Sequence, residues 1–243
     1  MGDESTIRLG LVLPDVLGTY SDSGNATVLA KRLEWRGISA KIVPIPFSGD
    51  VPSSLDIYLI GGGEDDAQSL AAARLRANPG VQKAAEQGAV VLAVCAGFQV
   101  LGTSFTTSDG VEHAGLGLLD VSTVPGRRRA VGEVVVKVDD GYGGEPLSGF
   151  ENHLGSTTVG STGAPLGKVT RGIGNGDGSE GAVSGHVLAT YLHGPVLARN
   201  PALADLLLEW AMGSRLPALN VDEVTELRRQ RLAGNRFGRR RGA

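Results

Sequence analysis

Cysteine and aromatic residues are scarce in this chain. One cysteine occurs among 243 residues, and aromatic side chains make up 5% of the sequence. A single thiol excludes an internal disulfide framework and a zinc site built from several thiolates, so nothing indicates an oxidising compartment. No apolar run approaches the roughly 20 residues of a membrane span, and the start at residues 1–6 is acidic and polar, unlike a signal peptide. We therefore expect a cytoplasmic protein.

An ATP-binding signature is also missing. The chain contains no Gly-x-x-x-x-Gly-Lys-Ser/Thr stretch, and Gly61-Gly62-Gly63 is followed by acids, without the lysine and hydroxyl of a phosphate loop. We expect this chain to bind neither a cofactor nor a metal ion.

The formal net charge of −3 conceals an asymmetry between the body and the C-terminus. Residues 1–227 contain 16 basic and 26 acidic groups, a balance of −10. A solvated terminus is the plainest interpretation of the basic end, and contact with an acidic partner or an anionic lipid surface is the alternative. Nucleic-acid binding is disfavoured because the body is acidic. The arginines of this end are Arg228, Arg229, Arg231, Arg236, Arg239, Arg240 and Arg241.

Short β-prone runs alternate with helical patterns in the first part of the chain, which is typical of a parallel sheet covered by helices on both faces. The expected strands are residues 7–13, 40–45, 55–60 and 89–94, and the expected helices are residues 26–36, 66–76 and 81–87.

The alternation of strands with helices ends in the second part of the chain. Residues 116–124, 131–138, 146–152 and 187–192 look like strands with glycine-rich turns, and we expect an antiparallel extension of the sheet. A helix over 200–212 follows, capped by Asn200 with Pro201 at its first position. The length and the 41% hydrophobic content suit one α/β domain over residues 1–213. Residues 214–243 would form a C-terminal helix over 222–232 and the arginine-rich tail.

Cys95 lies between the apolar run 89–94 and the small residues Ala96 and Gly97, which predicts a buried strand turning sharply into a helix. A side chain on such a turn stands clear of its neighbours, and the N–H groups that open the helix can stabilise negative charge. A lone cysteine after an apolar strand is more often an inert core residue.

Three other segments favour a nucleophile at this position. Gly61-Gly62-Gly63 ends an apolar strand in a loop whose backbone can approach a ligand closely. His193 ends the β-prone run 187–192 and is followed by Gly-Pro, so it lies at a strand end, where catalytic bases occur in open α/β sheets. Residues 150–155 form a polar cluster with no obvious core role.

The motifs of these segments resemble class I, triad-type glutamine amidotransferases of the cobyric-acid-synthase-like branch. They are Gly61-Gly62-Gly63, Cys95-Ala96-Gly97-Phe98-Gln99 and Tyr191-Leu192-His193-Gly194-Pro195. Within that branch, residues 20–25, 115–120 and 150–153 look like those of the glutaminase subunits of lipid II isoglutaminyl synthases. The resemblance spans about residues 7–213. It implies a three-layer, flavodoxin-like α/β fold and hydrolysis of L-glutamine.

Glutamine hydrolysis needs a nucleophile, a proton donor for the leaving nitrogen and donors for a tetrahedral oxyanion. The resemblance implies that the fold brings Cys95 and His193 together for the first two roles. We expect the oxyanion hole to be formed by the backbone N–H of Ala96 and one from Gly62 or Gly63.

A free amino acid presents an α-carboxylate, which arginine is best shaped to bind through paired hydrogen bonds. Among Arg127, Arg128 and Arg129 we choose Arg129, because the family pattern places an arginine three residues before a Gly-acid pair, here Gly132-Glu133. Gln99 would present its amide to the substrate. Asn152 and His153 could line the same pocket or pack at a strand end.

The third position of the triad departs from the wider family. Most class I enzymes have His-x-Glu, whereas His193 is followed by Gly194 and Pro195. Asp15, Asp22 or Glu151 could take the place of this acid. We favour a carboxylate from a partner subunit, which would make the histidine competent only in the complex.

The resemblance implies a heterodimer with a Mur-ligase-like subunit that binds ATP and Mg²⁺ and amidates D-glutamate in lipid II, with at most peripheral membrane contact. Two alternatives remain open. A stand-alone cysteine amidohydrolase would turn over glutamine without a partner, and a non-catalytic binding module would tolerate Cys95→Ser.

Overall fold

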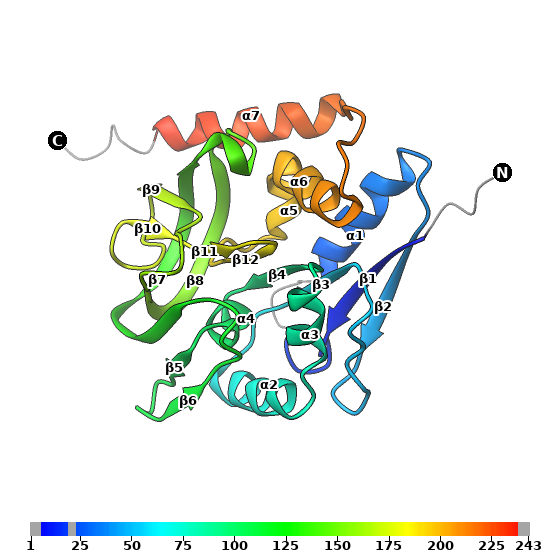
Figure 1. Cartoon of the computed structure of the whole chain (residues 1–243). Coiled ribbons are helices and arrows are strands. Elements are labelled where there is room, and N and C mark those ends of the chain that lie inside the picture. The colour runs from blue at the N-terminus through cyan, green and yellow to red at the C-terminus, as the bar shows by residue number, and fades with distance from the viewer. Residues whose placement is uncertain (1–5, 19–22, 238–243) are drawn as a thin grey trace.

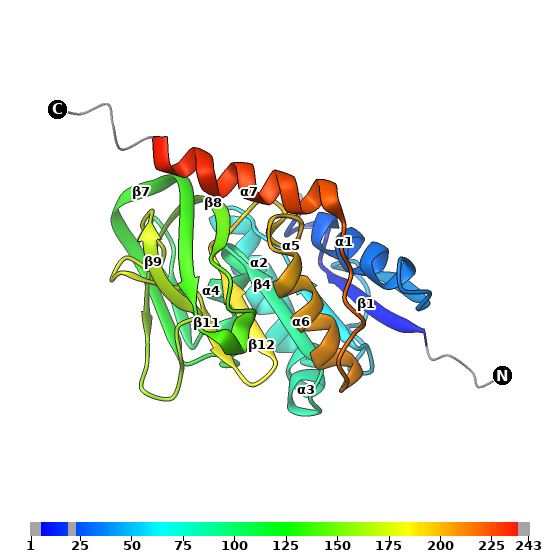
Figure 2. The same cartoon turned by 90° about the horizontal axis from the view of Figure 1, so that it is seen from above.

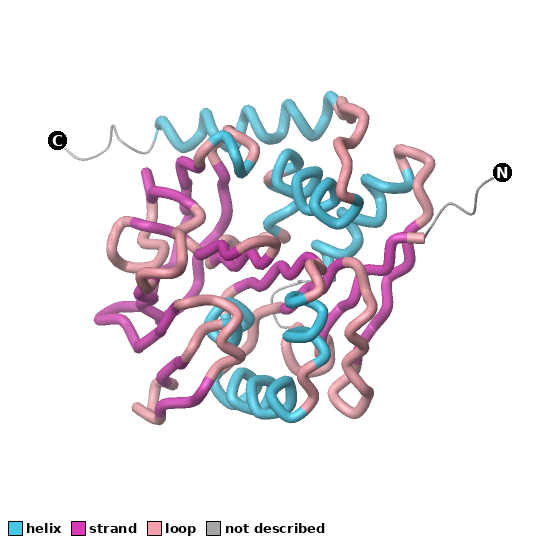
Figure 3. The backbone as a smooth tube through the Cα atoms, in the orientation of Figure 1, coloured by secondary structure: helices cyan, strands magenta, loops and turns pink. Residues whose placement is uncertain are grey.

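The computed structural model describes residues 6–18 and 23–237, which form two β-sheets with helices packed around the larger one (Figure 1). Figure 3 shows strands through the centre and along one flank, with helices above and below the central ones. Several expectations lie outside the described residues: the acidic start, Asp22, and Arg239, Arg240 and Arg241.

The first sheet has the strand order β11-β12-β4-β3-β1-β2. Its strands are parallel except for the edge strand β11, which is antiparallel to β12. Runs rich in valine, isoleucine and leucine suit such strands, because both of their faces are buried. The expected parallel sheet is confirmed. The strands are β1 (Ile7–Val12), β2 (Ala40–Ile45), β3 (Ile57–Ile60), β4 (Val90–Val94), β11 (Ala182–Ser184) and β12 (Val187–Thr190).

Helices cover both faces of this sheet, because successive strand side chains point to opposite sides. Leu59 and Leu92 pack with α1 and α6 in one core, while Tyr58 and Val91 pack with α2, α3 and α4 in another. Figure 2 shows the resulting three layers from above. The helices are α1 (Ser23–Glu34), α2 (Asp65–Ala77), α3 (Gly80–Glu86), α4 (Ala96–Leu101), α5 (Val196–Arg199) and α6 (Pro201–Met212).

The middle of the chain forms a second sheet, whereas we expected all of its strands to extend the first. Only β11 supplies the antiparallel extension. The expected strands 116–124 and 131–138 are one long strand, β7, whose pairing with β8 shifts register between Pro125 and Ala130. A short 3-10 helix (Asp140–Tyr142) connects β7 to β8. The strands are β5 (Ser104–Thr106), β6 (Glu112–Ala114), β7 (Val121–Val138), β8 (Leu147–Val159), β9 (Gly167–Arg171) and β10 (Ser179–Glu180).

The C-terminal helix α7 (Asp222–Phe237) includes the expected helix 222–232 and lies across one side of the molecule (Figure 2). Arg228 anchors it by donating to the carbonyls of Pro146 and Arg199 and to the Glu145 carboxylate. Asn200 precedes α6 as expected, but its side chain does not cap that helix; its Oδ1 accepts from the Ser148 N–H instead. No helix within the described ranges is long and apolar enough to cross a bilayer.

Candidate active site

Cys95 lies on a strained turn between β4 and α4. Its φ of 57° and ψ of −111° place a non-glycine residue in a region that L-amino acids rarely adopt. The turn requires Gly97 behind it, because a Cβ atom there would lie 2.8 Å from the Ile60 carbonyl oxygen. The side chain is 6% exposed. The expected strand–turn–helix arrangement is therefore present, and the strain is of the kind that accompanies function.

His193 reaches the same edge of the sheet from the neighbouring strand. β12 pairs with β4 in parallel up to Thr190 and Val94, and the Cys95 N–H donates to the Thr190 carbonyl at 3.0 Å. Because parallel strands end at a common edge, residues 98 positions apart in sequence leave adjacent strands there.

The His193 ring is oriented by the second sheet. Its Nδ1 is 2.9 Å from the Phe150 carbonyl oxygen, and the two residues also form a backbone bridge. In the neutral ring, Nδ1–H donates to that carbonyl, so Nε2 carries the lone pair. Burial lowers the pKa of His193, which favours the neutral ring that can accept a thiol proton.

A pocket of about 410 Å³ opens beside Cys95, between the first sheet and the β7–β8 pair. It brings together most of the residues selected from the sequence, but His193 is not part of its lining. Gly63 and Ala96 line it, whereas Gly62 is buried behind the lining. The pocket is lined by residues that include Gly63, Gln68, Cys95, Ala96, Gln99, Arg129, Asn152 and His153.

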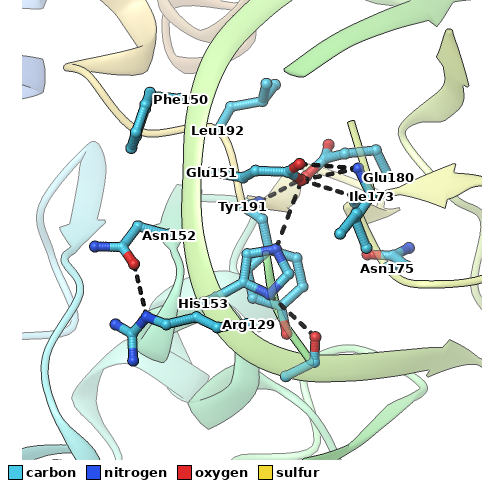
Figure 4. Close-up of polar contacts among 12 residues, drawn as sticks. Arg129, Phe150, Glu151, Asn152, His153, Ile173, Asn175, Glu180, Tyr191 and Leu192 are labelled. Atoms are coloured by element: carbon cyan, nitrogen blue, oxygen red, sulfur yellow. Dashed lines mark hydrogen bonds and ion pairs between the residues drawn. The ribbon is translucent and has the colours of Figure 1, made fainter. Parts of the chain in front are cut away.

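Arg129 and Asn152 form the exposed wall of the pocket. The Arg129 Nε donates to the Asn152 Oδ1 at 2.8 Å, across neighbouring strands of the second sheet (Figure 4). This contact holds the guanidinium group at the pocket and leaves its terminal nitrogens available for an anion. Arg128 lines a neighbouring hollow instead.

Gln99 lies in the pocket wall, but both ends of its amide contact other side chains. Its oxygen accepts from the Gln68 Nε2 at 2.7 Å, and its Nε2 donates to the Tyr191 hydroxyl at 3.2 Å. His153 stacks on the Tyr191 ring, with the ring centres 3.7 Å apart. These contacts make Gln99 and His153 a fixed floor beneath the substrate space.

The candidate triad acids have other contacts in the described part of the chain. Both carboxylate oxygens of Asp15 are 3.1 Å from the Phe47 N–H. The Glu151 carboxylate accepts from the backbone N–H groups of Ile173 and Gly174, and it lies 3.9 Å from His153. Burial raises the pKa of Glu151, but the nearby His153 and these two amides together outweigh burial, so the pKa is lowered.

Sequence reasoning missed Gln68 and Glu180. Gln68 lies on α2 and contacts Gln99 from a helix we expected only to cover the sheet. Glu180 follows a glycine-rich stretch that looks like an exposed turn, yet it is 0% exposed. A charged residue just ahead of a buried apolar strand was the only signal available.

Cys95 follows a central parallel strand on a strained turn, His193 follows the neighbouring strand, and a pocket opens beside Cys95. This arrangement is that of an α/β enzyme with a candidate cysteine nucleophile. Residues 8–201 match the CobB/CobQ-like glutamine amidotransferase domain. The chain belongs to this family, as its motifs predicted.

Individual relatives agree with this assignment. The chain is 36% identical over 236 residues to the lipid II isoglutaminyl synthase (glutamine-hydrolyzing) subunit GatD of Staphylococcus aureus (strain N315), covering 94% of this chain and 95% of the relative. The subunit of that name from Streptococcus pneumoniae (strain ATCC BAA-255 / R6) is 33% identical over 82% of this chain and 77% of its own length. The cobyric acid synthase of Sphingopyxis alaskensis (strain DSM 13593 / LMG 18877 / RB2256) is 31% identical over 69% of this chain but 34% of its own length.

Solved structures share the fold. A crystal structure of a glutamine amidotransferase superposes with a TM-score of 0.59 at 23% identity, covering 84% of this chain and 98% of the other. The glutaminase domain of Trypanosoma brucei CTPS with bound acivicin superposes with a TM-score of 0.53 at 13% identity, covering 87% of this chain and 96% of the other. The class I glutamine amidotransferase fold is thus confirmed.

Proposed function

We propose that this chain is the glutaminase subunit of a lipid II isoglutaminyl synthase. It would hydrolyse L-glutamine and pass ammonia to a MurT-like, Mur-ligase-family partner that amidates D-glutamate in lipid II. The observation that carries the proposal is the pair Cys95 and His193 after adjacent parallel strands, in a chain that matches a GatD subunit over 94% of its length.

The reaction begins with proton transfer from the Cys95 thiol to the His193 Nε2. The thiolate attacks the side-chain amide carbon of glutamine, and the N–H groups of Ala96 and of Gly63 or Gly62 stabilise the oxyanion. His193 returns the proton to the nitrogen, the C–N bond breaks and ammonia leaves. Water, deprotonated by His193, then attacks the thioester, releasing glutamate and restoring the thiol. The net change is glutamine and water to glutamate and ammonia.

Arg129 would bind the α-carboxylate of the glutamine. Its contact with Asn152 supports this role, since it fixes one nitrogen of the guanidinium and leaves the fork available for a bidentate pair. His153 and Gln99 would act mainly by shaping the floor of the pocket.

The partner would complete the enzyme in two ways. Amide synthesis needs an activated acyl group, so ATP and Mg²⁺ would bind to the ligase subunit of a cytoplasmic heterodimer. The partner would also supply a carboxylate to orient His193, which would accept the Nδ1–H in place of the Phe150 carbonyl. The backbone contacts of Asp15 and Glu151 support this division, because those carboxylates are already held elsewhere.

The test is to co-express the chain with its candidate ligase and to measure glutamate release with and without lipid II and ATP. We expect release to depend on the partner and to accompany amidation. A stand-alone amidohydrolase would release glutamate at the same rate without the ligase, and that result would contradict the proposal.

A further inference from the structure

Glu180 is a fully buried carboxyl group close to the active site, outside the set of residues assigned above. It ends β10 and is 0% exposed. The Thr190 hydroxyl donates to it, at 3.0 Å from Oε1 and 3.1 Å from Oε2. The backbone N–H of Tyr191 donates to Oε1 at 2.6 Å. Glu180 therefore contacts Thr190, the last residue of β12, and Tyr191, the next residue toward His193. Figure 4 shows Glu180 beside Tyr191.

These contacts lie where the backbone pairing of β12 with its two neighbouring strands ends. β4 turns away at Cys95, and the last rung between the two strands is the bond from the Cys95 N–H to the Thr190 carbonyl. The Tyr191 N–H follows on the other edge of the strand, just beyond the β11–β12 ladder, which ends with the pair Ala182 and Ala189. It is buried and would be costly to leave unpaired. The Glu180 carboxyl accepts from this amide.

The hydrogen bonds continue from Glu180 to His193. The Thr190 hydroxyl that donates to Glu180 also accepts from the Leu192 N–H at 3.0 Å. The His193 N–H then donates to the Phe150 carbonyl at 2.9 Å. Every amide from Tyr191 to His193 is thus held, the first two of them through Glu180 directly or through Thr190.

The Tyr191 side chain connects this part of the backbone to the residues that line the pocket. Its hydroxyl lies 2.7 Å from the Thr157 hydroxyl and accepts from Gln99, and its ring stacks on His153. Gln99 and His153 line the pocket. A shift of the Tyr191 backbone would therefore move the pocket floor together with the histidine.

Glu180 is itself held by a rigid turn. The Asn175 side chain donates to the Gly181 carbonyl at 2.9 Å and accepts from the Gly181 N–H at 3.0 Å. Burial, with a smaller contribution from the Glu151 charge, raises the pKa of Glu180 to about 7, against the lowering effect of the Tyr191 and Thr190 contacts. Glu151 on β8 is the charged group whose effect on Glu180 is resolved.

We propose that Glu180 is a positioning residue for this site: its carboxyl group fixes the backbone from Thr190 to Leu192 and so aims the His193 imidazole at Cys95. The inference rests on the proposed glutaminase function. Glu180 touches neither the substrate nor the thiol in this scheme, and it acts only through the strand end.

The test compares Glu180→Ala with Glu180→Gln. Alanine removes both contacts, whereas glutamine can still accept from the Tyr191 N–H and donate to the Thr190 oxygen. Asp120→Asn is a matched control, because Asp120 also accepts from a threonine hydroxyl and a backbone N–H, both of Thr162, but does not line the pocket. The readouts are kcat and KM for glutamine in the complex, and the pH dependence of alkylation by iodoacetamide. The chain has one cysteine, so alkylation reports on Cys95 alone.

In Glu180→Ala we expect kcat to fall by about 10- to 100-fold with little change in KM, since a misplaced catalytic group costs this much. The Cys95 alkylation profile should shift at the same time, because the thiolate loses its aligned histidine. Glu180→Gln should recover most of the rate, and Asp120→Asn should match the wild type.

A folded Glu180→Ala variant with unchanged kcat and unchanged alkylation would overturn the inference. So would an equal loss in Asp120→Asn, or a loss in Glu180→Gln as large as in the alanine variant. If Glu180→Ala does not fold, Thr190→Val decides: a lower kcat supports the inference and an unchanged kcat overturns it. A wild-type complex without glutaminase activity would refute the proposed function, while the alkylation profiles would still test the positioning role.

Discussion

The two walls of the candidate active site, a buried one with Cys95 and His193 and an exposed one with Arg129 and Asn152, are built differently. Cys95 and His193 follow adjacent strands of the first sheet, are 6% and 5% exposed, and are held through backbone contacts. Arg129 and Asn152 lie on neighbouring strands of the second sheet, and the hydrogen bond between them is exposed to solvent.

Under the proposed function, this difference separates the residues of the chemical step from those that bind the substrate. Groups that exchange protons need a geometry fixed within a fraction of an ångström, which a buried sheet edge provides. A group that captures an incoming carboxylate can tolerate motion. Changes in the buried wall should therefore lower kcat, and changes in the exposed wall should mainly raise KM.

The largest effect is expected at Cys95. Cys95→Ala and Cys95→Ser should abolish glutamine-dependent amidation, because no other thiol exists in the chain. Folding and partner binding should persist. Amidation supported by free ammonium is the control, and it should survive because the ligase site does not use this thiol. Glutamine-dependent activity in either variant would show that Cys95 is not the nucleophile.

The next effect concerns the acid that orients His193. If the partner supplies it, the isolated chain should be a poor glutaminase, and removal of that carboxylate should cost a factor of about 10⁴ in kcat/KM. A structure of the complex would identify the partner carboxylate nearest His193, and its alanine variant would be assayed beside one of a more distant acid. Full activity after its removal would leave Asp15, Asp22 and Glu151 as the candidates for the acid that orients His193.

The difference between the walls also explains what the sequence could predict. Cys95 and His193 each end an apolar run and are followed by small residues or by Gly-Pro, so the pattern within ten residues locates them. The parallel sheet follows from the same runs. These features are local in sequence. A strand that is buried on both faces appears as a continuous apolar run, so a local pattern is enough to predict it.

The contacts around them are not local. Gln68 contacts Gln99 from 31 positions away, and Glu180 contacts Tyr191 from the opposite side of the β11–β12 hairpin. The register shift in β7 falls at Pro125 and Gly126, which look like the end of a strand and hid its continuity. Such contacts depend on which helices and strands pack against each other in the fold, and the pattern of a single sequence does not show this packing.

Burial should also appear in the pH dependence of stability. The pKa of Glu180 is raised from 4.5 to about 7 in the folded chain. The folded state therefore binds more protons than the unfolded state between these values, so the stability contribution is complete below pH 4.5 and is lost as the pH rises through 7. The loss should reach about 3 kcal/mol by pH 8, since each pKa unit is worth about 1.4 kcal/mol.

Glu180→Gln should remove this loss, because an amide does not titrate. Urea unfolding of the wild type and the variant at pH 5 and pH 8 measures it. We expect the stability difference between them to shift in favour of the variant at the higher pH. A difference that stays constant would mean that the carboxyl group is not desolvated, and the contrast between the two walls would weaken.

The smallest effect is expected at the exposed wall. Arg129→Ala should raise the KM for glutamine and cost about 2–3 kcal/mol of binding, the contribution of a charge-assisted pair. Arg127→Ala and Arg128→Ala are matched controls on the same strand, and each should have a much smaller effect, because only Arg129 lines the pocket and contacts Asn152. Kinetics of the three single variants decide the assignment. Equal small effects would move carboxylate recognition to another residue, and a fall in kcat alone would place Arg129 with the chemistry rather than with recognition.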